Sequence, residues 1–324
     1  MRIRRTPFLT YFLAATTASR DRSHVIVLLV STIALTVQTS LAVANDPPVA
    51  TADTATAEPA AAADKDRIEL RIVFDNNPSD ERLETAWGFS CVITGFEKTI
   101  LFDTGIDGKM LLRNLEKCGI DPKEIDAVVL SHSHGDHTAG LAEFLKVNAE
   151  VEVYMPAIFP AQFKDQVRQT AAKVVETEDP QKACEGVWTT GVIHRRVPEQ
   201  GIYIRTAEGI VVVTGCAHPG IVQITRAAKA HAKEPVKLVL GGFHLGEIMP
   251  DGIERVIDGL KSTGAKQVAP THCTGEEAIE RIRKAFGEEG LAIGAGSRQV
   301  FPAAKRQKAA EPDGDDQNAG SAPR

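Results

Sequence analysis

The sequence predicts a mixed α/β protein of the α+β kind, and two observations carry this prediction. Segments with the two-residue period of a strand alternate with segments with the period of a helix along most of the chain. Two pairs of neighbouring strands are joined around glycines, which makes hairpins and therefore sheets of mixed direction. Several strands are followed directly by histidine-containing loops. Because chemistry concentrates in loops held by a rigid scaffold, these loops are the candidate functional positions.

The chain begins with a pattern typical of an exported protein. Arginines between Arg2 and Arg22 precede an apolar run from Val25 to Val37, and the small-residue pattern Leu41-Ala42-Val43-Ala44 follows. This order predicts a signal peptide over residues 1–44 and a periplasmic location. An uncleaved membrane anchor is the alternative, although a span needs about 20 apolar residues and polar residues dilute this run. A membrane is expected as a partner only in that anchored form.

Two further segments lack any apolar periodicity. Residues 45–64 are rich in Ala, Thr, Pro and acidic residues, and residues 303–324 are rich in Lys, Gln, Asp, Gly and Ala. Such compositions cannot bury a core, so we expect a disordered linker and a disordered tail. The remaining residues, 65–302, are enough for one large domain.

The first half of this domain is expected to begin with strands, after which helices and strands alternate. Strands are expected at Ile68–Phe74, Ser90–Thr94 and Thr99–Phe102, the last two forming a hairpin around Gly95. A one-sided pattern of Met and Leu predicts a helix over Gly108–Lys117, closed by Gly119. The next expected elements are a strand at Ala127–Leu130, a helix at Ala139–Lys146 and a strand at Val151–Tyr154.

The second half alternates more regularly after residues 156–190, which give no clear assignment. A strand pair is expected at Ile202–Arg205 and Ile210–Val213, around Glu208-Gly209. The elements expected after it are a helix at Ile221–Ala232, a strand at Val236–Leu240, a helix at Ile253–Lys261, a strand at Gln267–Ala269 and a helix at Glu276–Phe286.

One loop concentrates the side chains that bind transition metals. His132, His134, Asp136 and His137 follow the strand at 127–130 within six positions. Imidazole and carboxylate suit Zn²⁺, and Fe or Mn accept the same mixture. In an extended segment His132 and His134 point to the same side. A tight turn at Gly135 would then bring the other two to a second ion, so we expect this loop to bind metal.

Three later strand ends each present one histidine: His218, His244 and His272. A single histidine at a strand end is commonly a hydrogen-bonded structural residue. Three of them, together with a loop that needs more ligands, favour a shared site. Cys216 and Cys273 lie in two of the same loops.

Taken together, the motifs resemble a known family. The segment from His132 to His137, preceded by Leu101-Phe102-Asp103-Thr104-Gly105, is similar to the metallo-β-lactamase superfamily of hydrolases. Four more motifs resemble, in order, the dihydropterin-ribofuranosylaminobenzene-phosphate synthase-like branch: Trp87–Ser90, Thr214–Ile221, Gly241–Leu245 and Pro270–Gly275. The resemblance covers roughly residues 68–301. It implies a four-layer αββα sandwich with two mixed sheets.

The resemblance also implies two divalent metal ions, with Zn²⁺ favoured and Fe or Mn as alternatives. His132, His134 and His218 are expected on one ion. Asp136, His137 and His272 are expected on the other. Asp103 is expected to accept the second ring N–H of a ligating histidine and so to fix its tautomer.

Two positions depart from the common superfamily pattern. By spacing, Glu199 stands where many relatives have a histidine, and Cys216 stands where they have an acidic residue that bridges both ions. Cys216 is either a thiolate ligand or a packed thiol, and a single-metal site stays open. His244 is either a ligand or a proton donor, and the donor role is favoured. Asp136 or a metal-bound water is expected to pass a proton to the leaving group, assisted by His244.

The charge balance argues against a nucleic-acid partner. Without residues 1–44, which hold five Arg and one Asp, 32 basic and 42 acidic residues remain, a net charge of −10. A surface for polyanions needs a basic stripe, and residues 65–301 contain none. The five widely spaced cysteines do not describe a disulfide framework, although one pair could form after export.

The expected function is hydrolysis of a small ester, phosphoester or related substrate by a metal-activated hydroxide. Three alternatives stay open: an Fe-dependent oxygenase in the same fold, a pterin-pathway synthase-like activity, and a metal-binding protein without turnover.

Overall fold

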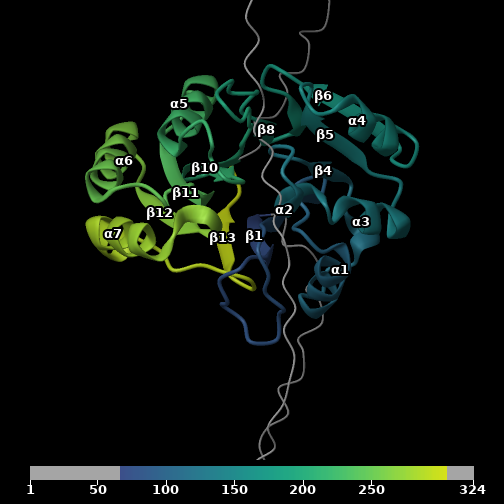
Figure 1. Ribbon diagram of the computed structural model, residues 1–324, viewed down its shortest axis with the longest axis horizontal. Coiled ribbons are helices and arrows are strands. Elements are labelled where there is room, and N and C mark those ends of the chain that lie inside the picture. Colours follow the sequence, from purple (N-terminus) through teal and green to yellow (C-terminus); the bar gives the residue numbers. More distant parts are fainter. Residues whose placement is uncertain (1–65, 305–324) are drawn as a thin grey trace, which may run out of the picture. The chain divides into compact units, whose positions relative to one another are not determined.

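Two β-sheets pack face to face in the part of the chain that the computed structural model describes, residues 66–304, and helices cover their outer faces (Figure 1). These residues all belong to one compact unit. The layer order is helix, sheet, sheet, helix, which confirms the predicted four-layer αββα sandwich. The predicted signal peptide (1–44), the linker (45–64) and the predicted tail after Ala304 lie outside the described residues.

The first sheet has seven strands in the spatial order β13-β1-β2-β3-β4-β5-β6. The strands are β1 (Arg67–Phe74), β2 (Ser90–Thr94), β3 (Ile100–Phe102), β4 (Ala127–Val129), β5 (Glu152–Pro156), β6 (Lys173–Thr177) and β13 (Arg298–Pro302). β13, β1, β2 and β3 pair antiparallel, whereas β3, β4, β5 and β6 pair parallel. The sheet is therefore mixed.

The second sheet has six strands in the order β12-β11-β10-β9-β8-β7. The strands are β7 (Lys182–Cys184), β8 (Val187–Thr189), β9 (Ile202–Thr206), β10 (Gly209–Thr214), β11 (Val236–Gly242) and β12 (Gln267–Thr271). β10, β11 and β12 are parallel, and the others are antiparallel. The carboxyl ends of the three parallel strands therefore meet at one edge of the sheet.

Helices cover each sheet on the side away from its partner. α5 (Ile221–Ala232), α6 (Pro250–Thr263) and α7 (Glu276–Phe286) pack on the second sheet. α1 (Gly108–Lys117), α3 (Leu141–Val147) and α4 (Ala161–Arg168) pack on the first. The short helix α2 (Gly135–Thr138) follows β4, and 3₁₀ turns occupy η1 (Pro122–Glu124), η2 (His272–Thr274) and η3 (Gly287–Glu289).

The period-two pattern of β10 shows why both faces of the sheets are apolar. Val211 and Val213 point into the layer between the sheets, whereas Ile210 and Val212 point under the helices. Alternate residues of a strand face opposite sides, so a strand buried on both faces needs an unbroken apolar run. Burying each such side chain contributes about 1.5–3 kcal/mol.

The helix α1 shows how closely local sequence fixes an element. Its expected range, Gly108–Lys117, is also the observed one. Asp107 caps the start, since its carboxylate accepts the N–H groups of Lys109 and Met110. Leu111 and Leu115 lie one turn apart and are both fully buried.

The structure adds elements to those expected. The helix expected at Ala139–Lys146 is α3, shifted by one or two residues, and the turn expected at Gly135 is the start of the additional one-turn helix α2. The unassigned segment 156–190 contains α4 and three strands. β13, which pairs with β1, was not expected at all.

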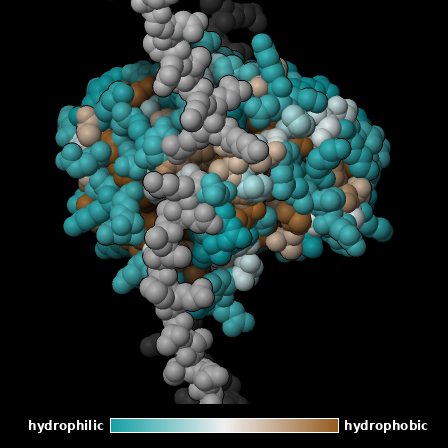
Figure 2. Space-filling view, turned by 180° about the vertical axis from the view of Figure 1, so that it is seen from behind, coloured by the Kyte–Doolittle hydropathy of each residue, from teal (hydrophilic) through white to brown (hydrophobic). Residues whose placement is uncertain are grey.

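The surface of the described residues is mostly polar. Figure 2 shows a face covered largely by hydrophilic residues, with hydrophobic residues in separate patches. Within residues 66–304, the helices are too short and too polar for any of them to traverse a bilayer.

Candidate metal centre

The expected ligands come from loops at the carboxyl ends of strands in both sheets. The loop after β4 in the first sheet supplies His132 to His137, and the loops after β10, β11 and β12 supply the rest. The fold therefore brings together side chains that lie up to 140 positions apart between His132 and His272. They form three neighbouring groups of ligand atoms, with Cys216 shared by two of them.

The first group holds three histidines, His132, His134 and His218, whose ligand atoms lie within 4.8 Å of one another. Each pair of rings has its centroids 4.7 Å apart. Nε2 of His132 and Nδ1 of His218 are buried and have no hydrogen-bond partner. A buried nitrogen without a partner is costly, and convergent lone pairs are the arrangement that a metal ion satisfies.

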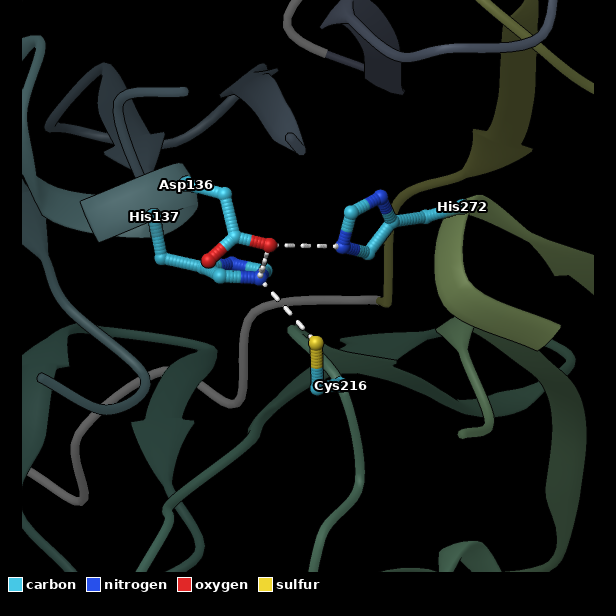
Figure 3. A group of neighbouring side chains, drawn as sticks. All are labelled: Asp136, His137, Cys216 and His272. Carbon is cyan, nitrogen blue, oxygen red and sulfur yellow. Dashed lines mark hydrogen bonds and ion pairs between the residues drawn. The ribbon is translucent and has the colours of Figure 1, made fainter. Parts of the chain in front are cut away.

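The second group holds Asp136, His137, Cys216 and His272 (Figure 3). Oδ2 of Asp136 lies 3.5 Å from Nε2 of His137 and 3.3 Å from Nε2 of His272. The Cys216 sulfur lies 3.1 Å from Nε2 of His137. Nε2 of His272 is buried and lacks a hydrogen-bond partner. Carboxylate, imidazole and thiolate are all ligands of Zn²⁺, so this group also fits a metal ion.

Asp103 and Ser131 set the ring orientation in both groups. The Asp103 carboxylate accepts the N–H of Ser131 (2.7 Å), its Oγ–H (2.7 Å) and the ring Nδ1–H of His137 (2.7 Å). Because the Ser131 hydroxyl donates to Asp103, Nδ1–H of His132 must donate to that hydroxyl oxygen, 2.9 Å away. In their neutral forms both rings are thereby held in the tautomer whose Nε2 carries no proton.

His272 is held in the same way by a residue of the loop after β1. Asn76 accepts the ring Nδ1–H of His272 (2.8 Å) and donates to its carbonyl oxygen (3.3 Å). Next to it, Asp75 accepts the Thr271 hydroxyl at 2.8 Å. Burial raises the pKa of Asp75 to about 6, although its hydrogen bonds oppose that shift.

Glu199 is fully buried and fixes the conformation of the loop that carries His218. Its carboxylate accepts the backbone N–H groups of Cys216, Ala217 and His218, each at 2.9 Å. Its Oε2 lies 3.4 Å from Nδ1 of His218 and 4.0 Å from Nδ1 of His132. Burial raises the pKa of Glu199. Glu199 therefore stands beside the first group without being one of its members.

The third group is made of Cys216, His244 and Cys273. The His244 ring stacks on His218, with centroids 4.3 Å apart. A hydrogen bond between the thiols raises the pKa of Cys216 and lowers that of Cys273, and the Cys273 sulfur raises the pKa of His244. His244, expected as a proton donor, thus faces two sulfur atoms.

The histidines of the two main groups differ in their pKa and therefore in their protonation state at pH 7. Burial lowers the pKa of His132 far below its usual value and, with the neighbouring His244, lowers that of His218 to about 4. Burial also disfavours a charge on His137, but Asp103 and Asp136 outweigh it and raise its pKa to about 10. The first group is therefore ready to bind a cation at pH 7, whereas His137 must first lose a proton.

Strained backbone collects at this site. Five non-glycine residues among those described have positive φ, and four of them are Asp103 (54°), Ala217 (58°), His244 (51°) and His272 (50°). Left-handed backbone in non-glycine residues costs free energy and clusters where function requires an exact side-chain direction. The fifth, Lys233, ends the helix α5.

An exposed tryptophan borders the second group. Trp87 is 53% exposed, and its ring centroid lies 4.9 Å from that of His272. The neighbouring Gly88 fits tightly, since a Cβ there would lie 2.6 Å from the Asp136 carbonyl oxygen. The segment therefore runs directly beside the metal-ligand loop and leaves an aromatic face open to solvent.

The structure brings together every residue expected as a ligand, in the pairing that was expected. Sequence reasoning missed Ser131, Asn76 and the cradle formed by Glu199. Cys273 was identified only as a residue that lies in one of the candidate loops. A serine directly before His132 was the one signal available in the sequence, because the other partners are far apart along the chain.

Comparisons with known proteins agree with this geometry. The family model of the metallo-beta-lactamase superfamily matches residues 88–245. The 7,8-dihydropterin-6-methyl-4-(beta-D-ribofuranosyl)-aminobenzene-5'-phosphate synthase of Methanocaldococcus jannaschii is 30% identical over 247 residues, which cover 62% of this chain and 84% of that protein. An uncharacterized protein of the same organism is 26% identical and covers 69% and 99% of the two chains.

Solved structures show the same architecture. A metal-dependent hydrolase of the beta-lactamase superfamily is 26% identical with a TM-score of 0.61, covering 72% of this chain and 98% of its own. The metallo-beta-lactamase fold protein YhfI from Bacillus subtilis is 15% identical with a TM-score of 0.55, covering 72% and 100%. The second likeness concerns the fold alone.

Proposed function

The chain belongs to the metallo-beta-lactamase superfamily, in the branch of the dihydropterin-ribofuranosylaminobenzene-phosphate synthase-like proteins, and from this we propose that it is a metal-dependent hydrolase. One observation carries the proposal. Three buried ring nitrogens, on His132, His218 and His272, lack hydrogen-bond partners, and these three residues belong to two adjacent ligand groups. We propose that these groups hold two divalent ions, with Zn²⁺ favoured by the imidazole, carboxylate and thiolate ligands.

When bound, such ions lower the pKa of water from 15.7 to about 7 and polarise the bond under attack. The residues of the chain supply position and tautomer. Asp103 holds His137, Ser131 holds His132, and Asn76 holds His272 with the ligating nitrogen directed inward. No serine or cysteine nucleophile is needed in this scheme.

Asp136 is the residue best placed to handle a proton during the reaction. Burial favours its neutral form, but the neighbouring His137 and His272 outweigh burial and lower its pKa, so it is an anion at neutral pH. It is also only partly buried, at the solvent side of the second group. A carboxylate there can take a proton from water and pass it to the leaving group.

The substrate class follows from the surroundings of the groups. An exposed tryptophan beside His272 offers a flat apolar face to the part of a small ester or phosphoester that is not attacked. The net charge of −10 without residues 1–44 supports a small-molecule substrate over nucleic acid. We propose a periplasmic location from the N-terminal pattern.

Metal content and turnover should fall together when a ligand is removed. The test compares His134→Ala with His194→Ala, since both side chains are exposed and His194 only pairs with Glu178 at the surface. Elemental analysis and hydrolysis of a chromogenic phosphodiester, a lactone and a thioester are measured on the purified full chain. We expect His134→Ala to lose one ion per chain and to lose turnover on the substrate that the wild type hydrolyses.

His194→Ala should match the wild type in both readouts. A wild-type chain that binds no stoichiometric metal after expression in medium with added Zn²⁺, Fe or Mn would disprove the proposal.

A second candidate is a synthase-like activity, because the 30% identical relative is named as a synthase. Formation of the product in that relative's name, followed by mass spectrometry, separates it from hydrolysis. An oxygenase is separated by the metal, since it requires redox-active Fe and consumes O₂.

A further inference from the structure

Two buried thiols and an imidazole converge beside the two groups just described, and one of these thiols, that of Cys216, also belongs to the second group. Sγ of Cys216, Sγ of Cys273 and a ring nitrogen of His244 all lie within 4.8 Å of one another. The two cysteines are only 3% and 8% exposed, and neither forms a disulfide. The other three described cysteines, Cys91, Cys118 and Cys184, belong to no such group.

The ends of three parallel strands build this convergence. Cys216 follows β10, His244 follows β11 and Cys273 follows β12. Between them, Gly242 leaves the space that the sulfur of Cys273 occupies, since a Cβ there would lie 2.7 Å from that sulfur. The absent side chain on the middle strand therefore lets thiols from the two outer strands meet.

The backbone of His244 is fixed for the same purpose. Its φ is 51°, a left-handed conformation that histidine adopts only at a cost. The ring is then clamped by stacking on His218 at 4.3 Å. This conformation turns the imidazole toward the sulfurs. Strained backbone of this kind is found where it positions a side chain for a function, so we infer that the direction of the imidazole matters.

We propose that Cys216, His244 and Cys273 form a third metal site, which binds a thiophilic ion such as Zn²⁺. Two thiolates and one imidazole are the ligand set that soft and borderline d¹⁰ ions select over hard cations. Bond lengths of about 2.3 Å to sulfur and 2.0–2.1 Å to nitrogen put ligand atoms under about 4 Å apart, so small side-chain rotations would bring these three ligand atoms to bonding distance. Cys216 belongs also to the second group, and one thiolate can bridge the two ions.

Binding at this site can be measured without turnover, so its test does not depend on whether the proposed hydrolysis occurs. A metal site would also explain why positions 216 and 273 are cysteines. If these side chains only filled space in the core, alanine or valine would serve as well. His244 would then be a metal ligand and not a proton donor.

The experiment counts ions and thiolate–metal bonds in the full chain. The protein is stripped with a chelator in the presence of a phosphine reductant, and Co²⁺ or Zn²⁺ is added back. We expect the wild type to bind three equivalents, and Cys273→Ser and His244→Gln to bind two. The thiolate-to-Co²⁺ charge-transfer absorption should fall in Cys273→Ser without vanishing, because Cys216 remains.

Cys118→Ser is the matched control, because Cys118 is a free, half-buried thiol at the end of α1, and it should bind three equivalents. His134→Ala should lose one ion and keep the full charge-transfer absorption, which separates this site from the histidine group. Equal stoichiometry in the wild type and Cys273→Ser would overturn the third site.

A second readout needs no variant and therefore does not depend on whether Cys273→Ser folds. Alkylation of the stripped wild-type chain is followed peptide by peptide during Zn²⁺ titration. Protection of Cys273 should appear with the third equivalent, whereas labelling of Cys273 that is unaffected by Zn²⁺ would contradict the proposal.

Discussion

Asp103 links the two histidine groups through a single carboxylate. It receives three hydrogen bonds, two from Ser131 and one from His137, and Ser131 in turn fixes His132. The residue sits in left-handed backbone with φ of 54° and is fully buried. A carboxylate in this place fixes tautomers on both sides of the site, so its charge matters more than its packing.

Asp103→Asn should weaken metal binding by about 10- to 100-fold, the usual effect of losing a partner behind a ligand. The amide cannot accept all three donors, so His137 loses its fixed tautomer. Competition with a chromogenic chelator measures the affinity of each ion. Asp107→Asn is the control, since Asp107 caps α1 at the surface and asparagine caps helices equally well. An unchanged affinity in Asp103→Asn would remove Asp103 from the site.

Metal binding at the second group should release protons, and binding at the first should not. The pKa of His137 is raised to about 10 and that of Cys216 is raised as well, so both are protonated at pH 7 and both must lose a proton to bind. The pKa of His218 is lowered to about 4 and that of His132 is lowered too, so these rings are already neutral.

Affinity at the second group should therefore rise as pH rises through neutrality, about 100-fold per pH unit for two displaced protons. Calorimetry at pH 7 in buffers of different ionisation enthalpy counts the protons directly. Cys216→Ser should reduce the count from two to one. A pH-independent affinity at both groups would contradict the assignment of His137.

The segments that carry the proposed ligands differ in how closely their glycines are packed. A Cβ on Gly242 would lie 2.4 Å from the Gly215 carbonyl oxygen, 2.7 Å from the Cys273 sulfur and 3.1 Å from Cδ2 of His272. A Cβ on Gly135, inside the histidine loop, would have no atom within 4 Å. Neither glycine has a positive φ, so only space distinguishes them.

Gly242→Ala should disrupt metal binding, whereas Gly135→Ala should be tolerated or slightly stabilising. Overpacking of this kind costs about 1–3 kcal/mol, and here it displaces β10 and β12 from each other. Alanine at the first position of α2 improves helix propensity by up to about 1 kcal/mol. Thermal unfolding and metal content of both variants decide the matter. Equal behaviour of the two would show that the strand ends are looser than the structure indicates.

The sequence predicted elements well where apolar residues repeat on one face and poorly where they do not. α1, α5 and α7 were predicted to the residue, because their buried positions recur every three or four residues. α4 buries only Val167, and β13 buries only Phe301, so neither has a period to detect. Their place is decided by partners far along the chain.

The same limit applies to the site. The histidines could be predicted because they lie in one dense motif and at three strand ends, and both features are visible without knowledge of the tertiary contacts. Asn76 could not, since it meets His272 across 196 positions. Glu199 was noticed through spacing, but its three backbone hydrogen bonds depend on a loop conformation that no local pattern shows.

At the scale of the molecule, the ligands belong to both sheets. His132 to His137 follow a strand of the first sheet, and His218 and His272 follow strands of the second. An ion held by both is a cross-link between the two halves of the sandwich. We therefore expect metal binding and folding stability to be coupled.

Stripping the ions should lower the melting temperature, and refilling should restore it. At a free ion concentration 100 times the Kd, each site adds about 2.7 kcal/mol to the free energy of unfolding. For a domain of this size that is a shift of roughly 5–10 °C. Calorimetry with Zn²⁺ measures it, and Mg²⁺ serves as the control because it prefers oxygen ligands. No shift with Zn²⁺ would mean that no ion spans the sheets.

Export should leave a mature chain that begins at Asn45. The apolar run and the small-residue pattern before it predict cleavage after Ala44. Mass spectrometry of the protein from the native cell envelope identifies the N-terminus. An intact Met1 in the membrane fraction would favour the anchored form.

Because each sheet supplies part of the proposed ligand set, the distance between two bound ions would depend on how the two sheets are aligned. The apolar layer between them, which includes Phe102 and Ile204, sets that alignment. Interiors transmit strain because they are close-packed, so a changed side chain in this layer will tilt one sheet against the other. The distances between ligands of the first sheet and ligands of the second will then change, although every ligand is intact. Substrate range in such a protein can thus drift through substitutions in its deepest core, far from any atom that the substrate touches.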